Sequence, residues 1–374
     1  MDTRLLKDSF ALVAPRAAEL AEYFYAQVFY RGGPDVQDMF PPLMTAQRDR
    51  LLAALTQIVT DVDNLEGLST YLAGLGRDHR KFAVRPEHYD VVGQALLASL
   101  SHFAGDAWTP ELHGTWAAAY ALVAKVMQEG AERDKDSPPW WDAVVTGREL
   151  RGSDVAVISV RTEQPLDYLA GQSVAVQYPE RMARVWRFYS PANAPDGTGE
   201  LTFHVKAEAG GLLSTVLAMS AEPGDKLRLG PPVGNLKLAP EANRDMVLLA
   251  GSTGLAPLLA ILEEVAARPA PPAAHLFFGA RDPGGLYARP ELEKLAGYDW
   301  LTVTHTVSQP PDDAPGYEGE HGSVVDVMAR HGSWDGRDAY ACGSTAMTRA
   351  AQGRLRALGV PAERVHVENF GWEG

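Results

Sequence analysis

The hydrophobic period of this chain changes twice along its 374 residues, and each period restricts the fold that its segment can adopt. Residues 3–133 place apolar side chains at helical intervals, with breaks at glycine or proline, which predicts an all-α domain. Residues 155–206 alternate apolar and polar side chains in short runs, which predicts a small antiparallel β-barrel. From Met246 onward strand-like runs alternate with helix-like runs, which predicts a parallel α/β domain.

The length of the chain also predicts a multidomain protein, because a single domain usually contains about 100–200 residues. Residues 134–139 are charged and then end in two prolines, as expected for a boundary. We therefore expect an all-α domain at residues 1–135, a barrel at 140–240 and an α/β domain at 241–374.

The composition argues against several classes of partner and site. The formal net charge of -14 disfavours nucleic acid and anionic membranes, because both bind basic surfaces. No run approaches the roughly 18 apolar residues that span a bilayer, and the N-terminus lacks the apolar core of a signal peptide, so we expect a cytoplasmic protein. The single cysteine, Cys342, excludes an internal disulfide, a thiolate zinc cluster and covalent Cys-x-x-Cys-His heme attachment.

Three polar side chains lie on apolar helical faces of the first domain. His79 recurs at helical spacing with Leu75 and Phe82, so its imidazole points into an aliphatic interior. Gln47 and Tyr25 lie on the apolar faces of two other predicted helices. One such residue alone is most often a core polar group that bonds a backbone carbonyl. Three together favour a shared site, and both interpretations stay open.

Two motifs in the predicted barrel favour a cofactor that carries phosphate. Arg187-Phe188-Tyr189-Ser190 lies on a predicted strand, although an edge strand with a surface arginine is the alternative. Residues 206–214 lead into a predicted helix, where unpaired N–H groups and the helix dipole stabilise a phosphate.

A third motif favours a nucleotide in the α/β domain. Gly251-Ser252-Thr253-Gly254-Leu255-Ala256-Pro257 follows an apolar strand and opens an apolar helix, which is the context of a nucleotide-binding loop. A plain loop is the alternative. Two further stretches, residues 278–281 and 340–347, each lie at the end of a later predicted strand. They favour a nucleotide-binding loop over a plain loop.

Together these motifs make the chain similar to the flavohemoglobin family, in which a globin domain is fused to a ferredoxin-NADP reductase-like module. The similarity covers essentially the whole chain and is strongest at residues 24–29, 38–40, 47–49, 79–82, 86–89 and 368–371. It implies a globin, an FAD-binding β-barrel and an α/β parallel-sheet nicotinamide-binding domain, with heme b, FAD and NAD(P)H as cofactors. It also implies a nitric oxide dioxygenase: electrons pass from NAD(P)H through FAD to heme, where dioxygen oxidises nitric oxide to nitrate.

The resemblance assigns the heme pocket residue by residue. His79 corresponds to the proximal iron ligand, and neutral imidazole is a suitable axial ligand. Tyr25 and Gln47 correspond to the distal residues that stabilise negative charge on bound dioxygen. Phe40 corresponds to the residue that packs on the porphyrin. Leu51 would narrow the gas channel, although core packing explains it equally well.

On the proximal side, the family connects its histidine to a tyrosine and a glutamate, which raises the basicity of the ligand. Tyr89 matches the tyrosine. Ungapped counting places Arg133 at the glutamate, with Glu132 beside it as the candidate carboxylate. Asp78 stands where close relatives carry a lysine. The departures at Arg133 and Asp78 bear on electron transfer between the domains more than on the binding of heme.

The resemblance also assigns roles in the reductase half. Arg187 corresponds to the residue that binds the flavin pyrophosphate, Tyr189 to the one that packs on the isoalloxazine, and Ser190 to the one that bonds the ring. The other implied contacts to FAD or the nicotinamide nucleotide are Lys206, Gly210, Gly211, Leu212, Ser214, Gly251, Thr253, Gly254, Pro257, Arg281, Cys342 and Gly343. Phe370 corresponds to an aromatic residue that covers the flavin, and Glu368 to the carboxylate beside it.

Two other functions are compatible with the sequence. One is a sensor or carrier globin for dioxygen or nitric oxide, kept ferrous by its own reductase, which the departures at Asp78 and Arg133 favour. The other is a flavin reductase whose helical domain binds no heme. The sequence leaves open the choice between NADH and NADPH, and between monomer and dimer.

Overall fold

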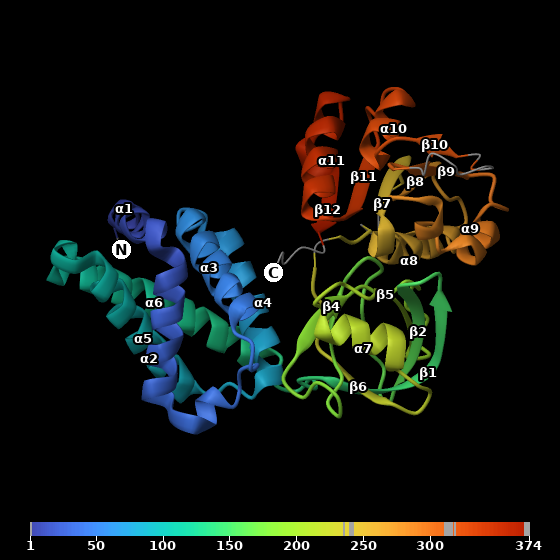
Figure 1. The fold of residues 1–374 in the computed structure, drawn as a ribbon. Coiled ribbons are helices and arrows are strands. Elements are labelled where there is room, and N and C mark those ends of the chain that lie inside the picture. The colour runs from blue at the N-terminus through green and yellow to red at the C-terminus, as the bar shows by residue number, and fades with distance from the viewer. Residues whose placement is uncertain (1, 235, 239–242, 310–316, 318, 370–374) are drawn as a thin grey trace. The chain divides into compact units, whose positions relative to one another are not determined.

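The computed structural model describes residues 2–234, 236–238, 243–309, 317 and 319–369. It divides between Trp140 and Trp141 into two compact units, one helical and one mixed (Figure 1). No helix in these described ranges combines the length and the apolar character that crossing a membrane requires.

The first unit is built from helices connected by short turns. Its α-helices are α1 (Thr3–Val13), α2 (Ala17–Gln37), α3 (Thr45–Thr60), α4 (Leu65–His79), α5 (Pro86–Ala104) and α6 (Pro110–Arg133). Single 3-10 turns lie at Ala14–Arg16, Arg80–Phe82 and Gly105–Ala107. This arrangement confirms the predicted all-α domain.

The predicted breaks in the helical pattern act in two ways. Pro86 and Pro110 are the first residues of α5 and α6, where a helix does not use the missing N–H group. Thr109 caps α6 by accepting a hydrogen bond from the Leu112 amide. Gly33, in contrast, kinks α2 from within, with a φ of 70° that favours glycine.

Helices α4 and α6 pack with their backbones in contact, through a glycine on each. A Cβ atom on Gly76 of α4 would lie 1.9 Å from the carbonyl oxygen of Met127, and one on Gly130 of α6 would lie 2.3 Å from that of Ala73. A small apolar cluster that includes Leu72 and Met127 surrounds this crossing. The last turn of α4 is therefore held firmly against α6.

The second unit begins with an antiparallel sheet that matches the predicted barrel. Its strands are β1 (Trp141–Arg151), β2 (Val155–Thr162), β3 (Val174–Gln177), β4 (Trp186–Tyr189), β5 (Glu200–Lys206) and β6 (Lys226–Leu229), and α7 (Leu212–Ser220) follows β5. Within the described residues the strand order is β4-β3-β6-β1-β2-β5. A bridge between Pro191, after β4, and Phe203 of β5 links the two outer strands and closes the sheet.

The rest of the second unit is a parallel sheet with helices on both faces, as predicted. Its strands are β7 (Met246–Gly251), β8 (Ala274–Ala280), β9 (Leu301–Val307), β10 (Glu320–His321), β11 (Asp338–Gly343) and β12 (Val365–Asn369). Its helices are α8 (Leu255–Ala266), α9 (Arg289–Leu295), α10 (Val324–Arg330) and α11 (Thr345–Ala357), and single 3-10 turns lie at Ser252–Gly254, Pro283–Gly285 and Ala362–Arg364. In the described part of the chain the strands run β10-β9-β8-β7-β11-β12, so the order reverses between β7 and β11.

Two apolar clusters cover the two faces of this sheet. Helices α8 and α9 pack on one face through residues such as Leu258 and Leu292. Helices α10 and α11 pack on the other, through residues such as Val327 and Leu355. Ligands of such sheets bind at the carboxyl ends of the strands where the order reverses, which here is the loop after β7.

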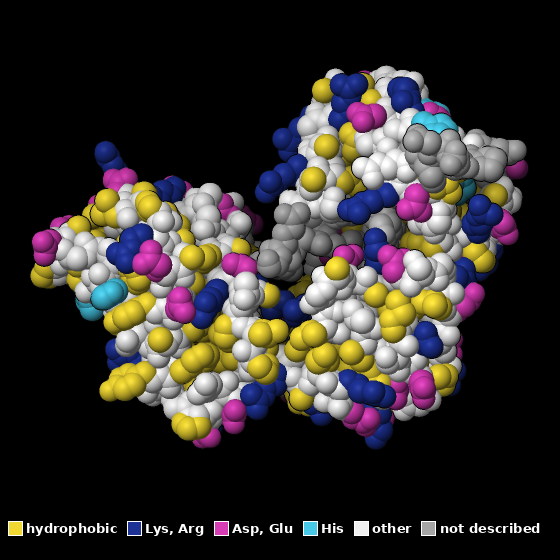
Figure 2. All heavy atoms as spheres, viewed as in Figure 1, with side chains coloured by type: hydrophobic (Ala, Val, Ile, Leu, Met, Phe, Trp, Pro, Cys, Tyr) yellow, Lys and Arg dark blue, Asp and Glu magenta, His cyan; other side chains and the backbone are white. Residues whose placement is uncertain are grey.

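Charged side chains are mixed on the surface. On the face drawn in Figure 2, acidic and basic side chains are interspersed over both units.

Candidate functional site

His79 is the last residue of α4, and its imidazole is held by its own helix. Nδ1 donates a hydrogen bond to the carbonyl oxygen of Leu75, one turn earlier, at 2.7 Å. This bond places the proton on Nδ1 and leaves the Nε2 lone pair available to a metal. Burial lowers the pKa of His79, so the ring is neutral at neutral pH. These features fit the axial ligand of a heme iron.

Tyr25, Gln47 and Phe40 come together at a second part of the helical core, as the resemblance implies. Tyr25 donates from its hydroxyl to the backbone carbonyl of Gln47 at 3.2 Å. The Phe40 ring packs edge-on at 5.5 Å from the Tyr25 ring, and Leu51 belongs to the same apolar cluster. Burial raises the pKa of Tyr25 to about 12, so the phenol keeps its proton and remains a donor.

The implied proximal partners behave differently from one another. Tyr89 and Leu75 both pack against the apolar cluster of Leu68, Leu72 and Met127, and the Tyr89 carbonyl accepts a hydrogen bond from Tyr120 at 2.5 Å. Glu132 instead pairs with Lys135 at 2.6 Å, and 69% of its side chain is exposed. The structure therefore does not bring Glu132 to His79, because α6 turns its glycine face toward α4 and its carboxylates toward solvent. The carbonyl of Leu75 takes the place expected for a carboxylate.

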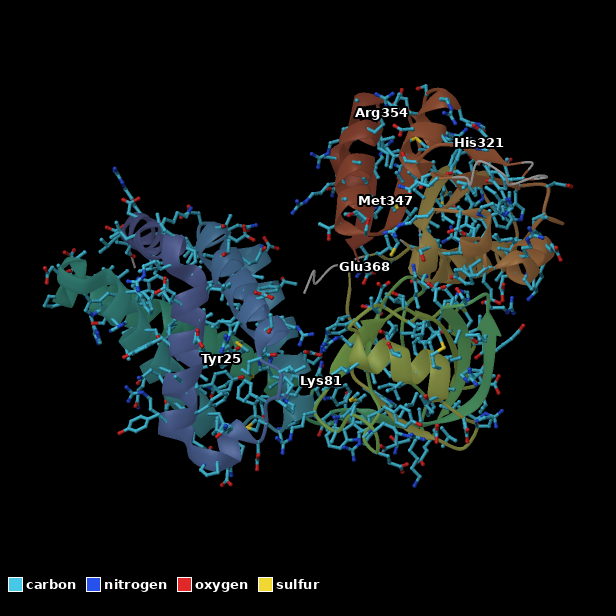
Figure 3. All side chains as sticks on the ribbon, viewed as in Figure 1. Tyr25, Lys81, His321, Met347, Arg354 and Glu368 are labelled. Atoms are coloured by element: carbon cyan, nitrogen blue, oxygen red, sulfur yellow. The ribbon has the colours of Figure 1, made fainter. Side chains whose placement is uncertain are left out.

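Lys81 is a feature that the sequence reasoning missed. Its side chain is 2% exposed and forms an ion pair with Asp78, which is 16% exposed. Figure 3 labels Lys81 and Tyr25 within the helical unit. The pair explains the unusual Asp78, since a buried ammonium group requires a counter-charge. The spacing of three residues between Asp78 and Lys81 was the available signal.

The predicted flavin motif lies at the end of β4. Tyr189 packs against Phe203 of β5 with ring centroids 6.5 Å apart, and burial raises its pKa. Arg187 is exposed and donates a hydrogen bond to the carbonyl of Trp186 at 2.9 Å. The hydroxyl oxygen of Ser190 is buried and has no hydrogen-bond partner in the part of the chain that the structure describes. Such a buried orphan fits a missing ligand, which makes the site suitable for a flavin.

The segment after β5 forms a tight loop at the start of α7. Gly210 has a φ of 78°, and Gly211 is the residue that precedes the helix. The Ser214 hydroxyl donates to the Gly211 carbonyl at 3.2 Å and accepts from the Glu208 amide at 3.3 Å. This hydroxyl, which was expected on a phosphate, therefore shapes the loop. The first amides of α7, from Leu212 onward, are the groups that a helix start leaves for an anion.

Lys206 lies at the end of β5, before this loop. Its ammonium group is 3.7 Å from a carboxylate oxygen of Asp154. About a third of the Lys206 side chain is exposed, so its charge remains near the loop surface.

The glycines of the loop after β7 pack closely against β11 and α11. A Cβ atom on Gly254 would lie 2.2 Å from the carbonyl oxygen of Cys342, and one on Gly251 would lie 2.5 Å from the sulfur of Met347. Gly343 meets the same Met347 sulfur. These glycines were expected to admit a pyrophosphate, and the structure shows that protein packing already requires them.

The remaining predicted nucleotide contacts lie at the same end of the sheet. Thr253 stands in the turn after β7, and Pro257 is buried in the first turn of α8. Arg281 follows β8 and is exposed. Cys342 is fully buried, and burial raises the pKa of its thiol, so it fits packing rather than nucleophilic chemistry.

Glu368 lies on β12 beside Cys342 of β11 and faces the barrel (Figure 3). A Cβ atom on Gly234 would lie 3.5 Å from one of its carboxylate oxygens. Burial raises the pKa of Glu368 to about 7, and a hydrogen bond from Ser173 opposes this shift. Its Oε2 is buried with no hydrogen-bond partner among the described residues. Phe370 lies outside the residues that the structure describes.

Comparisons with known proteins agree with this arrangement. A globin family model matches residues 27–127, an oxidoreductase FAD-binding domain matches 142–238, and an oxidoreductase NAD-binding domain matches 248–353. A flavohemoprotein from Rhizobium meliloti is 30% identical over 401 residues, which cover 99% of this chain and 98% of that relative. The chain belongs to the flavohemoprotein family. A Bordetella pertussis flavohemoprotein is 29% identical over the same shares of the two chains.

Solved structures share the flavohemoprotein fold. A flavohemoglobin from Malassezia yamatoensis, crystallised with bound FAD and heme, has a TM-score of 0.82 at 18% identity and covers 99% of this chain and 98% of its own. The FAD/NAD-binding domain of a Vibrio cholerae nitric oxide dioxygenase has a TM-score of 0.53 at 22% identity, and covers 63% of this chain and all of its own.

The family and the matched domains confirm the predicted fold class and the oxidoreductase class. The cofactors predicted for this flavohemoprotein are heme b, FAD and NAD(P)H, and they agree with its globin, FAD-binding and NAD-binding domains.

Proposed function

We propose that this flavohemoprotein is an NAD(P)H-dependent nitric oxide dioxygenase. Two molecules of nitric oxide and two of dioxygen take the electron pair of one NAD(P)H, which gives two nitrate ions, one oxidised nicotinamide and one proton. The observation that carries the proposal is that a neutral His79 with a free Nε2 and a buried Tyr25 donor share one helical unit, in a chain that also has FAD- and NAD-binding domains.

The bound groups supply the redox chemistry: heme iron changes by one electron, and flavin links this to the two-electron nicotinamide. The residues of the chain position and protect these groups. We assign His79 as the iron ligand, with Leu75 setting its orientation. Tyr25 can turn its hydroxyl from the Gln47 carbonyl toward dioxygen, because a hydroxyl hydrogen rotates freely.

The other residues of the heme pocket have supporting roles. The Gln47 side chain would reinforce Tyr25, Phe40 would pack on the porphyrin and Leu51 would narrow the approach of gases. Tyr89 would support the proximal side by packing against the same apolar cluster as Leu75. We do not retain Glu132 in this role, because its carboxylate pairs with Lys135 at the surface.

In the reductase half we assign the flavin to the end of β4 and the loop before α7. Ser190 would bond the flavin ring with its unpartnered hydroxyl, Tyr189 would stack and Arg187 would bind phosphate. The nicotinamide nucleotide would lie at the loop after β7, within reach of Thr253, Arg281 and Glu368. We keep the domain limits at 1–135, 140–240 and 241–374, and we expect the protein in the cytoplasm.

Anaerobic stopped-flow spectroscopy of the holoprotein tests this function directly. Adding NADH, and separately NADPH, should bleach the flavin and then yield ferrous heme, and aerobic addition of nitric oxide should give nitrate in step with NAD(P)H consumption. If neither NADH nor NADPH produces ferrous heme, the proposed reaction is excluded. Flavin bands without a Soret peak would instead indicate a heme-free flavin reductase.

One observation favours a second function, a sensor or carrier of dioxygen or nitric oxide. The proximal histidine bonds a neutral carbonyl, Leu75, rather than a carboxylate, so its basicity is raised less and turnover would be slower. Formation of nitrate coupled to NAD(P)H loss at a rate that exceeds ligand dissociation would exclude binding as the main role.

A further inference from the structure

Arg80, the residue after His79, binds the backbone of the segment that leaves α6. Its guanidinium donates hydrogen bonds to the carbonyl oxygens of Asp134, of Lys135 at 3.3 Å and of Ser137 at 2.7 Å. One side chain therefore holds three backbone carbonyls of a single short segment. A planar fork of five N–H donors suits this task, and the single ammonium group of a lysine does not.

A second arginine on α4 contacts the same segment. Nε of Arg77 lies 3.4 Å from a carboxylate oxygen of Asp134. Asp134 is therefore bound through its backbone by Arg80 and through its side chain by Arg77. Both arginines stand within two residues of His79.

The helices on each side of this contact are also held together. The close crossing at Gly76 and Gly130 places α4 backbone to backbone against α6. The end of α4, which carries His79, and the start of the segment after α6 therefore form one rigid piece. That segment, residues 134–140, is the covalent connection between the helical unit and the unit with the FAD- and NAD-binding domains.

We propose that Arg80 is a positioning residue for electron transfer from flavin to heme, because it clamps the connecting segment to the helix that ends at His79. The inference rests on the proposed function, in which His79 holds the heme and the second unit reduces it. A connecting segment that is free from its first residue samples many more arrangements than one held at Asp134, Lys135 and Ser137, so productive approach of the two cofactors becomes rarer.

A simpler role is that Arg80 only caps the turn that follows α6 by bonding its carbonyl oxygens. The two roles predict different results. A capping residue affects the stability of the helical unit alone, whereas a clamp also changes the rate of the step between the two cofactors. The flavin reduction rate reports on neither role and serves as an internal standard.

The experiment compares holoproteins of the wild type with Arg80→Lys, Arg80→Ala and Lys135→Ala. Lys135→Ala removes from the same segment a cation that pairs with its neighbour Glu132, so it controls for charge. Stopped-flow under anaerobic conditions measures flavin reduction and heme reduction in each variant, and hydrogen exchange measures the protection of residues 134–140.

We expect all variants to reduce flavin at the wild-type rate and to keep the wild-type Soret spectrum. In both Arg80 variants, heme reduction should slow about ten-fold and become multiphasic, with faster exchange at residues 134–140. Lys135→Ala should match the wild type. If Arg80→Lys transfers electrons to heme at the wild-type rate, or if Lys135→Ala slows transfer equally, the clamp is excluded.

The outcomes also separate this inference from the function on which it rests. Wild-type protein that never reduces its heme contradicts the dioxygenase proposal, whatever the Arg80 variants do. Wild-type protein that reduces heme normally, with Arg80 variants that do the same despite a loosened connecting segment, contradicts the clamp alone. If Arg80→Ala does not retain heme, Arg80→Lys decides the question.

Discussion

The proposed heme pocket in the helical unit and the proposed cofactor sites of the second unit treat their polar atoms in opposite ways. In the helical unit, Nδ1 of His79 and the hydroxyl of Tyr25 already bond backbone carbonyls of the protein. In the second unit, the hydroxyl of Ser190 and Oε2 of Glu368 are buried without a hydrogen-bond partner among the described residues. The protein itself orients the polar atoms of the first, whereas those of the second are left for the proposed ligands to bond.

This difference has an energetic consequence. A buried polar atom that lacks a partner destabilises the folded protein, by roughly 1–3 kcal/mol, until something bonds to it. Removing such an atom should leave the apoprotein at least as stable as before and should weaken only the binding of the ligand. Removing an atom that the protein already bonds should affect both folding and function.

Replacing His79 with alanine should have the largest effect, because the ligand supplied by the protein disappears. We expect loss of the Soret band and a fall in nitric oxide consumption of at least about 100-fold, with flavin reduction unchanged. A pyridine hemochrome assay measures the heme content, and a nitric oxide electrode measures the rate of nitric oxide consumption. His113→Ala, at an exposed histidine of α6, is the control. Wild-type porphyrin content in His79→Ala would remove the basis of the heme assignment.

Ser190→Ala should weaken flavin binding by about ten-fold or more, because the proposed bond to the ring is lost. The apoprotein should be at least as stable as the wild type, because no protein bond is broken and a buried oxygen without a partner is removed. Ser214→Ala is the matched control, because that hydroxyl already has partners in its loop and its removal should destabilise by about 1 kcal/mol. Fluorescence titration with FAD and urea unfolding of the apoprotein give the two quantities, and equal flavin affinity in Ser190→Ala and wild type would refute the assignment.

Tyr25→Phe should reduce nitric oxide turnover by about ten-fold and speed the dissociation of dioxygen, because the ligand loses its donor. It should also destabilise the helical unit by about 1 kcal/mol through loss of the bond to Gln47. Flash photolysis measures the dissociation rate. Unchanged dissociation would show that the hydroxyl serves only the backbone of Gln47.

Glu368→Gln should have the smallest effect, and it should depend on pH. Burial raises the pKa of Glu368 to about 7, above its unfolded value, so the carboxylate form destabilises the fold. Stability from the protonated form is complete below the unfolded pKa and declines as the pH rises through about 7. We expect the variant to match the wild type near pH 4 and to exceed it by about 1 kcal/mol at pH 8 in urea unfolding of the apoprotein. If the variant and the wild type differ in unfolding free energy by the same amount at pH 4 and pH 8, the raised pKa of Glu368 is contradicted.

Much of this architecture was predictable from local pattern. The change from helical to alternating period located the helical unit and the barrel, and the apolar runs at Met246 and His275 are β7 and β8. Pro86 and Pro110 marked the true starts of two helices. Tyr25 of α2 contacts the backbone of Gln47 in α3 and the ring of Phe40, which lies between these two helices.

Other features could not be predicted, because they depend on which helix faces meet. The crossing at Gly76 and Gly130 turns Glu132 toward solvent and leaves the Leu75 carbonyl as the partner of His79. The burial of Lys81 with Asp78 has the same origin. A pattern of residues states which side of a helix is apolar, and it does not state which neighbour covers that side.

The sequence by itself determined the order and type of the domains, the histidine on an apolar stripe and the loops that suit phosphate, because these follow from period and residue type along the chain. Only the tertiary structure decided which polar atoms find partners within the protein. Hydrogen bonds such as those of Arg80 to residues 134–137 join positions more than fifty apart in the sequence, and only packing brings such positions together.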